Sequence, residues 1–343
     1  MEGNAGNIHP DVYKAYSDNL RKAVGGVFRS DDYGDRYFDL QAQLQSNVTR
    51  FAAYKAYHLT EQLKKQREKW TDDDEYKKVA KAVLNTFNRY QAAEYNTATA
   101  RARTAKQWTD FTSDPIANEL YPNLKWLPSR SANPREEHMV FYNRVWAKSD
   151  PFWSENQPGN LWNCKCDWEE TDDPVTDSNP TDAHHAKGLD GNPAETGEIF
   201  TKECTYFKQA GRNVSKETMR TVREVNREKY GNLVRHFDTG LGDILVDDIT
   251  IREVTKGSKT AESYFYKQEV ALNFDKYISQ LIQLPDEEID LTHNNHRSIF
   301  YQRKKLFSAM KVYKLTLHGY DFQVKIGAFK TGGLNLYAIT EPD

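Results

Sequence analysis

Pro158-Gly159-Asn160-Leu161-Trp162-Asn163-Cys164-Lys165-Cys166 is the stretch that decides the fold in the middle of this chain. Two shorter motifs precede it, Arg135-Glu136-Glu137-His138 and Asp150-Pro151-Phe152-Trp153. These motifs and their neighbours contain two of the three cysteines and four of the seven tryptophans: Trp146, Trp153, Trp162 and Trp168. Turn-forming residues and aromatic rings without a long apolar run predict a compact, loop-rich module over 115–170 that specific side chains hold together.

The segment before this module has a helical pattern. Apolar residues recur every three or four positions from Phe38 to about Lys69, and a second helix is predicted from about Glu75 to Phe111, with no glycine or proline inside it. Thr71-Asp72-Asp73-Asp74 interrupts the helical pattern and provides a good N-cap for the second helix. We therefore expect an N-terminal arm over 1–37 and a long antiparallel helical hairpin over 38–114.

The segments after the module change character twice. Residues 171–210 are polar and rich in turn formers, which predicts an extended linker or strap. Residues 211–343 predict a small C-terminal α+β domain. They contain a helical pattern at Ala261–Leu284, alternating apolar positions over Leu241–Val254, and three strands of an antiparallel sheet at Lys311–Leu317, Asp321–Phe329 and Leu334–Ile339. The predicted fold class of the whole chain is α+β.

Composition excludes several classes of protein. The 343 residues are 38% hydrophobic and 28% charged, with a net charge of -3, so nothing global favours wrapping nucleic acid. No window is apolar enough for a membrane span, and we expect neither a membrane partner nor a signal peptide. Three cysteines do not make a disulfide framework, which favours a reducing cytoplasm or a particle assembled there. P-loop, dinucleotide-binding, zinc-peptidase and serine-hydrolase motifs do not occur.

One group of residues has the chemistry of a metal site. Cys164 and Cys166 supply thiolates and His138 an imidazole, the usual ligands of structural zinc, and Cys204, His184 or His185 would complete a set of four. The alternative is that the cysteines are small buried hydrophobic residues and that His138 hydrogen-bonds a backbone carbonyl.

Four other residues of the central motifs have a predicted structural role: Arg135, Asp150, Trp153 and Asn163. We expect Arg135 to form an ion pair with Asp150 or Glu137, because the aliphatic core of the module is small.

A second group of residues, in the C-terminal domain, has side chains suited to catalysis. It consists of His293, His296, Lys304 and His318. Histidines with a nearby lysine provide what metal-independent RNA cleavage needs, namely a base, an acid and a cation that stabilises the charged phosphorane. The alternative is a polar loop with surface charges, because the cluster has no defining spacing.

The order R-x-x-H, D-P-F-W and P-G-N-x-W-N-C-x-C resembles the phage head morphogenesis proteins related to protein F of phage Mu. The matching positions are Arg135, His138, Asp150, Pro151, Phe152, Trp153, Pro158, Asn163, Cys164 and Cys166. Upstream, 93–98, 105–108 and 121–126 resemble the long helix and the strand that precede the motif; downstream, 188–193, 198–200 and 206–207 resemble the strap that follows it. The sequence departs from the family at Gln157-Pro158-Gly159-Asn160, where relatives more often have two prolines.

The resemblance implies a minor capsid protein of a tailed phage or prophage that acts in head assembly near the portal. It implies the portal protein and the major capsid protein as partners, and the virion as the location. Such proteins are often fused to toxin-like domains, and the C-terminal domain resembles the barnase, colicin and RelE-like nuclease domains found there. An RNA-cleaving effector delivered with the phage is therefore the alternative function, with phage DNA or host RNA as a further partner.

Overall fold

The structure is a computed structural model, and it describes residues 8–28, 37–176, 180, 182, 184–210, 216–231, 233–254, 256, 258, 260–289, 291 and 298–342. The chain forms two compact units, residues 1–219 and 220–343, and each is described by itself below. Helices dominate the first unit and a sheet dominates the second, so the predicted α+β class is confirmed. No helix in the described ranges is long and apolar enough to cross a membrane.

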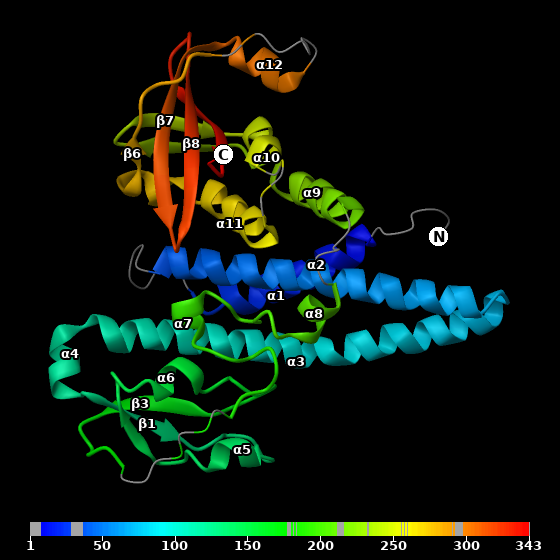
Figure 1. The fold of residues 1–343 in the computed structure, drawn as a ribbon, viewed down its shortest axis with the longest axis vertical. Helices are drawn as coiled ribbons and strands as arrows, with labels where there is room; N and C mark the ends of the chain where they lie inside the picture. Colours follow the sequence, from blue (N-terminus) through cyan, green and yellow to red (C-terminus); the bar gives the residue numbers. More distant parts are fainter. Residues whose placement is uncertain are drawn as a thin grey trace. The chain divides into compact units, whose positions relative to one another are not determined.

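Three helices form the body of the N-terminal unit: α1 (Pro10–Gly25), α2 (Phe38–Lys69) and α3 (Asp73–Ser113). The α2 and α3 helices run antiparallel as the predicted hairpin, and α1 packs against both of them (Figure 1). The Asp72 carboxylate accepts hydrogen bonds from the backbone N–H groups of Asp74 and Glu75, which satisfies donors that the first turn of α3 leaves unpaired.

Alanines allow the closely packed half of this hairpin to form. Ala98, Ala102 and Ala105 on α3 are fully buried, since small side chains let neighbouring segments approach the helix backbone. Charged side chains are buried there as well, because Lys55 on α2 and Glu94 on α3 form an ion pair inside the bundle. The other half of the hairpin, around its tip at Trp70, is exposed.

The central module contains short elements around a small sheet. These are α4 (Pro115–Leu120), β1 (Asn123–Leu127), α5 (Glu136–Met139), β2 (Val145–Ala147), α6 (Phe152–Glu155) and β3 (Asp167–Thr171). The antiparallel strand order is β2-β1-β3. Its core is aromatic: the rings of Trp146 and Phe152 stack at 4.0 Å, and Trp126 and Trp153 stack at 6.2 Å.

The segment 184–204 has little regular structure. It contains α7 (Pro193–Thr196) and is followed by α8 (Thr205–Ala210). We call residues 184–204 the strap. It lies against α2 and α3, where Phe200 stacks on Phe51 with a ring separation of 4.0 Å.

The C-terminal unit contains a six-stranded sheet with the order β4-β5-β9-β8-β7-β6. Its elements are α9 (Lys216–Gly231, which begins in the first unit), β4 (Arg235–Thr239), β5 (Gly242–Val246), α10 (Asp248–Val254), α11 (Ala261–Leu272), η2 (Phe274–Gln280), β6 (Ile282–Gln283), α12 (Ile299–Lys304), β7 (Phe307–Leu317), β8 (Tyr320–Phe329) and β9 (Leu334–Thr340). The three strands predicted in the last part of the chain are confirmed as β7, β8 and β9.

The structure corrects three sequence predictions in this unit. The sheet is mixed rather than wholly antiparallel, because β5 and β9 pair in parallel. The helix predicted over Ala261–Leu284 ends at Leu272, where Asn273 donates its side-chain N–H to the Glu269 carbonyl and a 3₁₀ helix follows. The alternating pattern of Leu241–Val254 is a strand only as far as Val246, because Asp247 accepts the Thr250 backbone N–H and α10 begins.

Candidate functional site

The three predicted metal ligands of the central module lie together. His138 is on α5, while Cys164 and Cys166 come between α6 and β3. Their ligand atoms lie within 4.8 Å of one another, and all three side chains are buried. His138 is only 1% exposed and packs edge to face against Trp126, with ring centroids 5.1 Å apart. The arrangement is a buried cluster of soft ligands that could hold a metal ion.

A hydrogen bond fixes how the His138 ring presents its nitrogens. Its Nε2 lies 2.9 Å from the His184 carbonyl oxygen, which can only accept, so Nε2 carries the proton. In the neutral ring Nδ1 then has a free lone pair. That atom lies 3.3 Å from Cys164 Sγ and 3.7 Å from Cys166 Sγ.

The two sulfurs of the cluster differ electrostatically. The Cys166 thiol hydrogen-bonds to Cys164 and lowers the pKa of that thiol, burial opposes the shift, and His138 adds to it. The neighbouring Cys164 sulfur and burial raise the pKa of Cys166. The two thiols are therefore coupled, and their pKa values shift in opposite directions.

None of the three predicted fourth ligands joins the cluster among the described residues. Cys204 is buried beside the backbone at Gly188, and burial raises its pKa to about 11. His184 contributes its backbone carbonyl, and its ring packs against Phe141. His185 lines two other surface hollows.

Two of the four residues predicted to be structural, Trp153 and Asn163, hold the central module together. Trp153 is fully buried, and its indole N–H donates to the Ala147 carbonyl at 3.0 Å. Asn163 has a positive φ of 58°, which asparagine tolerates better than most residues. Its backbone N–H donates to Thr97 on α3.

The ion pair expected for Arg135, with Asp150 or Glu137, is not formed in the described part of the structure. Its guanidinium donates to the Trp162 carbonyl at 3.4 Å instead. Asp150 accepts the backbone N–H of Phe152 at 2.8 Å and so helps to start α6. The physical reason is local: a carboxylate next to Pro151 finds an unpaired N–H in the turn that the proline begins.

Sequence reasoning missed the residue that holds the central module and the strap on α3. Arg101 is fully buried, and its guanidinium donates to the Asn160 side-chain oxygen at 2.6 Å. It also donates to four strap carbonyls, those of Leu189, Asp190, Gly191 and Glu198. An arginine among the alanines of α3 is the only sequence signal for it, because its partners are mostly backbone atoms.

A second residue, Asn47 on α2, holds the strap from the other side. Its side chain donates to the Phe200 carbonyl at 3.0 Å and accepts the Phe200 N–H at 2.9 Å. We call Arg101 and Asn47 together the strap clamp.

The predicted catalytic cluster of the C-terminal unit does not come together in its described part. His293 and His296 lie outside the described residues. Lys304 ends α12 just before β7, and its ammonium lies 5.9 Å from the Tyr337 ring centroid. His318 follows the other end of β7, where its ring packs near Tyr266. The 11 residues of β7 separate the two positions by roughly 30 Å, so Lys304 and His318 do not form one site.

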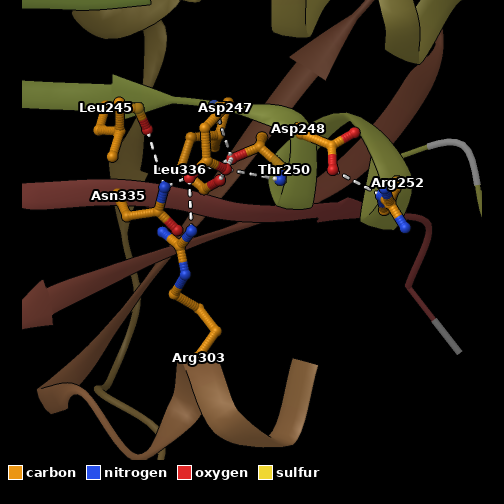
Figure 2. A network of polar contacts seen from close by, with 8 residues as sticks. All are labelled: Leu245, Asp247, Asp248, Thr250, Arg252, Arg303, Asn335 and Leu336. Atoms are coloured by element: carbon orange, nitrogen blue, oxygen red, sulfur yellow. Dashed lines mark hydrogen bonds and ion pairs between the residues drawn. The ribbon is translucent and has the colours of Figure 1, made fainter. Parts of the chain in front are cut away.

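Figure 2 shows a network of polar contacts in the described part of this unit. Arg303 forms an ion pair with Asp247 at 2.5 Å, and the Thr250 hydroxyl donates to the Leu336 carbonyl. Asn335 donates to the Leu245 carbonyl at 3.0 Å. These contacts join α10, α12, β5 and β9, which is a structural role.

Comparison with known proteins bears on one stretch of the chain. Over 87 residues, which are 25% of this chain, the sequence is 31% identical to the "Putative capsid assembly protein F" of Escherichia phage Mu. The chain spans about a fifth of that relative, since the match covers 19% of its length. No family model matches the sequence, and no solved structure matches it. The similarity supports a relation to phage head proteins, and none of these comparisons supports the nuclease resemblance of the C-terminal domain.

Proposed function

We propose that the chain is a minor head protein of a tailed phage or prophage and acts in head assembly near the portal. The observation that carries the proposal is the 31% identity to a capsid assembly protein of phage Mu. The motifs through which the sequence resembles that family have structural roles in this chain. They contribute residues to the aromatic core and place Asn163 at a backbone position with positive φ. They also include Asn160, whose side-chain oxygen accepts a hydrogen bond from Arg101.

The hairpin of α2 and α3 is the part that we expect to contact the portal protein or the major capsid protein. Large apolar side chains are exposed on its outer half, where Trp70 is 41% and Leu84 37% exposed. Tryptophan is one of the residue types that are enriched in protein interfaces.

The first experiment deletes the gene from the phage or prophage that carries it and complements it with variants. Wild-type protein is expected in purified heads, and the deletion is expected to lower the yield of DNA-filled heads. Absence of the protein from purified heads together with a normal yield in the deletion strain would refute the proposal.

Two matched substitutions test the hairpin. Trp70→Ala should reduce the amount of protein that copurifies with heads. Leu241→Ala removes a side chain of similar exposure, 39%, from the turn between β4 and β5, and should leave incorporation at the wild-type level. Equal incorporation of both variants would contradict the role of the hairpin while leaving the head-assembly proposal in place.

A further inference from the structure

We propose that His138, Cys164 and Cys166 bind one zinc ion, and that the fourth coordination position of this ion is open to a ligand from outside the module. The inference starts from donor chemistry. Two thiols and one imidazole nitrogen are the ligands that Zn²⁺ prefers, and three of them converge here from two separate segments of the chain.

The distances between the donor atoms fit the ion. Tetrahedral coordination with Zn–S of about 2.3 Å and Zn–N of about 2.0 Å places a sulfur and a nitrogen ligand about 3.5 Å apart. His138 Nδ1 lies 3.3 Å from one sulfur and 3.7 Å from the other. Both nitrogen–sulfur separations therefore fit tetrahedral zinc, and all three donor atoms lie within 4.8 Å of one another.

The surroundings of the cluster orient its ligands. The His184 carbonyl accepts the Nε2 proton of His138, so that Nδ1 faces the sulfurs with its lone pair. The backbone N–H of Cys166 points to Cys164 Sγ at 3.5 Å, which favours a thiolate there. Aromatic rings, including those of Trp126 and Phe141, enclose the imidazole. On the side of His138, a bound ion would therefore lie next to an aromatic wall.

The fourth position is the unusual part of the site. No further histidine, cysteine or carboxylate joins the three ligands in the part of the chain that the structure describes. A cavity of about 370 Å³ reaches both cysteines, with Ser129, Ser131, Asn133, Pro134, Arg135, Asn163 and Lys165 around it. Since Arg135 and Lys165 are cationic, this cavity suits water or a small anion as the fourth ligand.

The test measures metal in the full-length protein. Purified wild-type protein incubated with Zn²⁺ and desalted should retain about one zinc ion per chain. His138→Gln and Cys166→Ser should lose most of it, whereas Cys204→Ser, which removes a buried thiol outside the cluster, should retain it. Wild-type protein that retains no zinc, or a folded His138→Gln variant that retains a full equivalent, would overturn the proposal.

A second measurement needs no variant and so does not depend on how well the variants fold. Co²⁺ added to the metal-free wild-type protein should give thiolate-to-cobalt charge transfer in the near ultraviolet and visible bands of tetrahedral geometry. Azide should then shift the visible bands without releasing the cobalt, because it enters the open position. Absence of the charge-transfer band would overturn the site, and bands unchanged by saturating azide would overturn the open position.

Discussion

The strap of the N-terminal unit and the sheet of the C-terminal unit satisfy their backbone groups in opposite ways. In the sheet, β7 and β8 pair along almost their whole length, so the backbone supplies its own partners. In the strap, four carbonyls between Leu189 and Glu198 accept from one buried guanidinium, and Phe200 is paired by one asparagine. A segment without regular structure can thus be buried, provided that neighbouring helices supply the missing donors.

This difference makes the strap far more dependent on single side chains than the sheet is. A strand that loses one hydrogen bond keeps the others in its ladder, whereas the strap clamp concentrates many bonds in two residues. Because all seven tryptophans lie between Trp70 and Trp168, fluorescence reports on the unfolding of the N-terminal unit alone. The following substitutions use that property to test the comparison.

The largest effect is expected for Arg101→Met. It leaves the strap carbonyls and the Asn160 oxygen without their donor in a buried place, so the free energy of unfolding should fall by about 3–5 kcal/mol. Urea denaturation followed by tryptophan fluorescence measures it. As a control, Arg303→Met removes an arginine from the polar network of the C-terminal unit. Arg303 is less buried than Arg101, and its replacement should leave this transition unchanged. A loss below about 1 kcal/mol for Arg101→Met would show that the clamp is not needed.

A pH-dependent effect is expected at Glu94. Burial raises the pKa of its carboxyl from 4.5 to about 7, although Lys55 acts in the opposite direction. The folded state then holds a proton that the unfolded state has released, so this contribution to stability is lost as the pH rises from about 4.5 to about 7.

Glu94→Gln should remove that dependence. The free energy of unfolding of the wild type relative to the variant should fall by up to about 3 kcal/mol between about pH 5 and about pH 7. Urea titrations at several pH values measure it. The half-buried His58, whose pKa is lowered by burial, is common to both proteins and cancels. Parallel curves would mean that Glu94 stays ionised throughout.

A smaller difference in stability is expected between the alanine variants of two glycines with positive φ, Gly188 and Gly332. A Cβ at Gly188 in the strap would lie 2.6 Å from Cys204 Cα, whereas at Gly332, in the turn between β8 and β9, it would meet nothing within 4 Å. Both alanine variants carry the backbone cost of about 1–2 kcal/mol. Gly188→Ala should lose about 1–3 kcal/mol more through overpacking.

Differential scanning calorimetry, which also detects the tryptophan-free C-terminal unit, compares these two variants. Equal losses of stability would mean that the strap can shift away from Cys204 as freely as an exposed turn can open.

The smallest effect is expected for Asp72→Ala. Asp72 caps α3 at the exposed tip of the hairpin, far along the chain from the strap clamp, and its loss should cost about 1 kcal/mol locally. Amide hydrogen exchange should become faster at residues 73–76, with little change in the urea midpoint. A large shift of that midpoint would show that the tip and the strap unfold together.

The sequence was sufficient for elements that repeat a pattern. Apolar spacing predicted α2 and α3, and alternation predicted β7, β8 and β9, because burial on one face imposes a period on the residues. That His138, Cys164 and Cys166 lie together could be predicted as well, since thiols and imidazoles are rare and chemically specific. The partner of Arg135 and the role of Arg101 could not, because both arginines donate to backbone carbonyls that leave no signature in the side chains.

Residue order also explains why the parallel pair of strands was not predicted. The β8–β9 connection is short, and adjacent segments pair antiparallel by default. The parallel contact of β5 with β9 joins Ile244 to Leu334, which are 90 positions apart, and no local pattern records such a pairing.

That pairing sets the order in which the C-terminal unit can assemble. Strand β9 is translated after every other strand of the sheet, yet it lies between β5 and β8. Until β9 is in place, the β4–β5 hairpin and the β6–β7–β8 group have no common edge. Closing a loop of this length is entropically costly and slow compared with forming a hairpin. While residues 334–340 are still inside the ribosome, the nascent chain therefore holds two separate groups of strands. The sheet becomes one cooperative structure only when β9 is inserted between them.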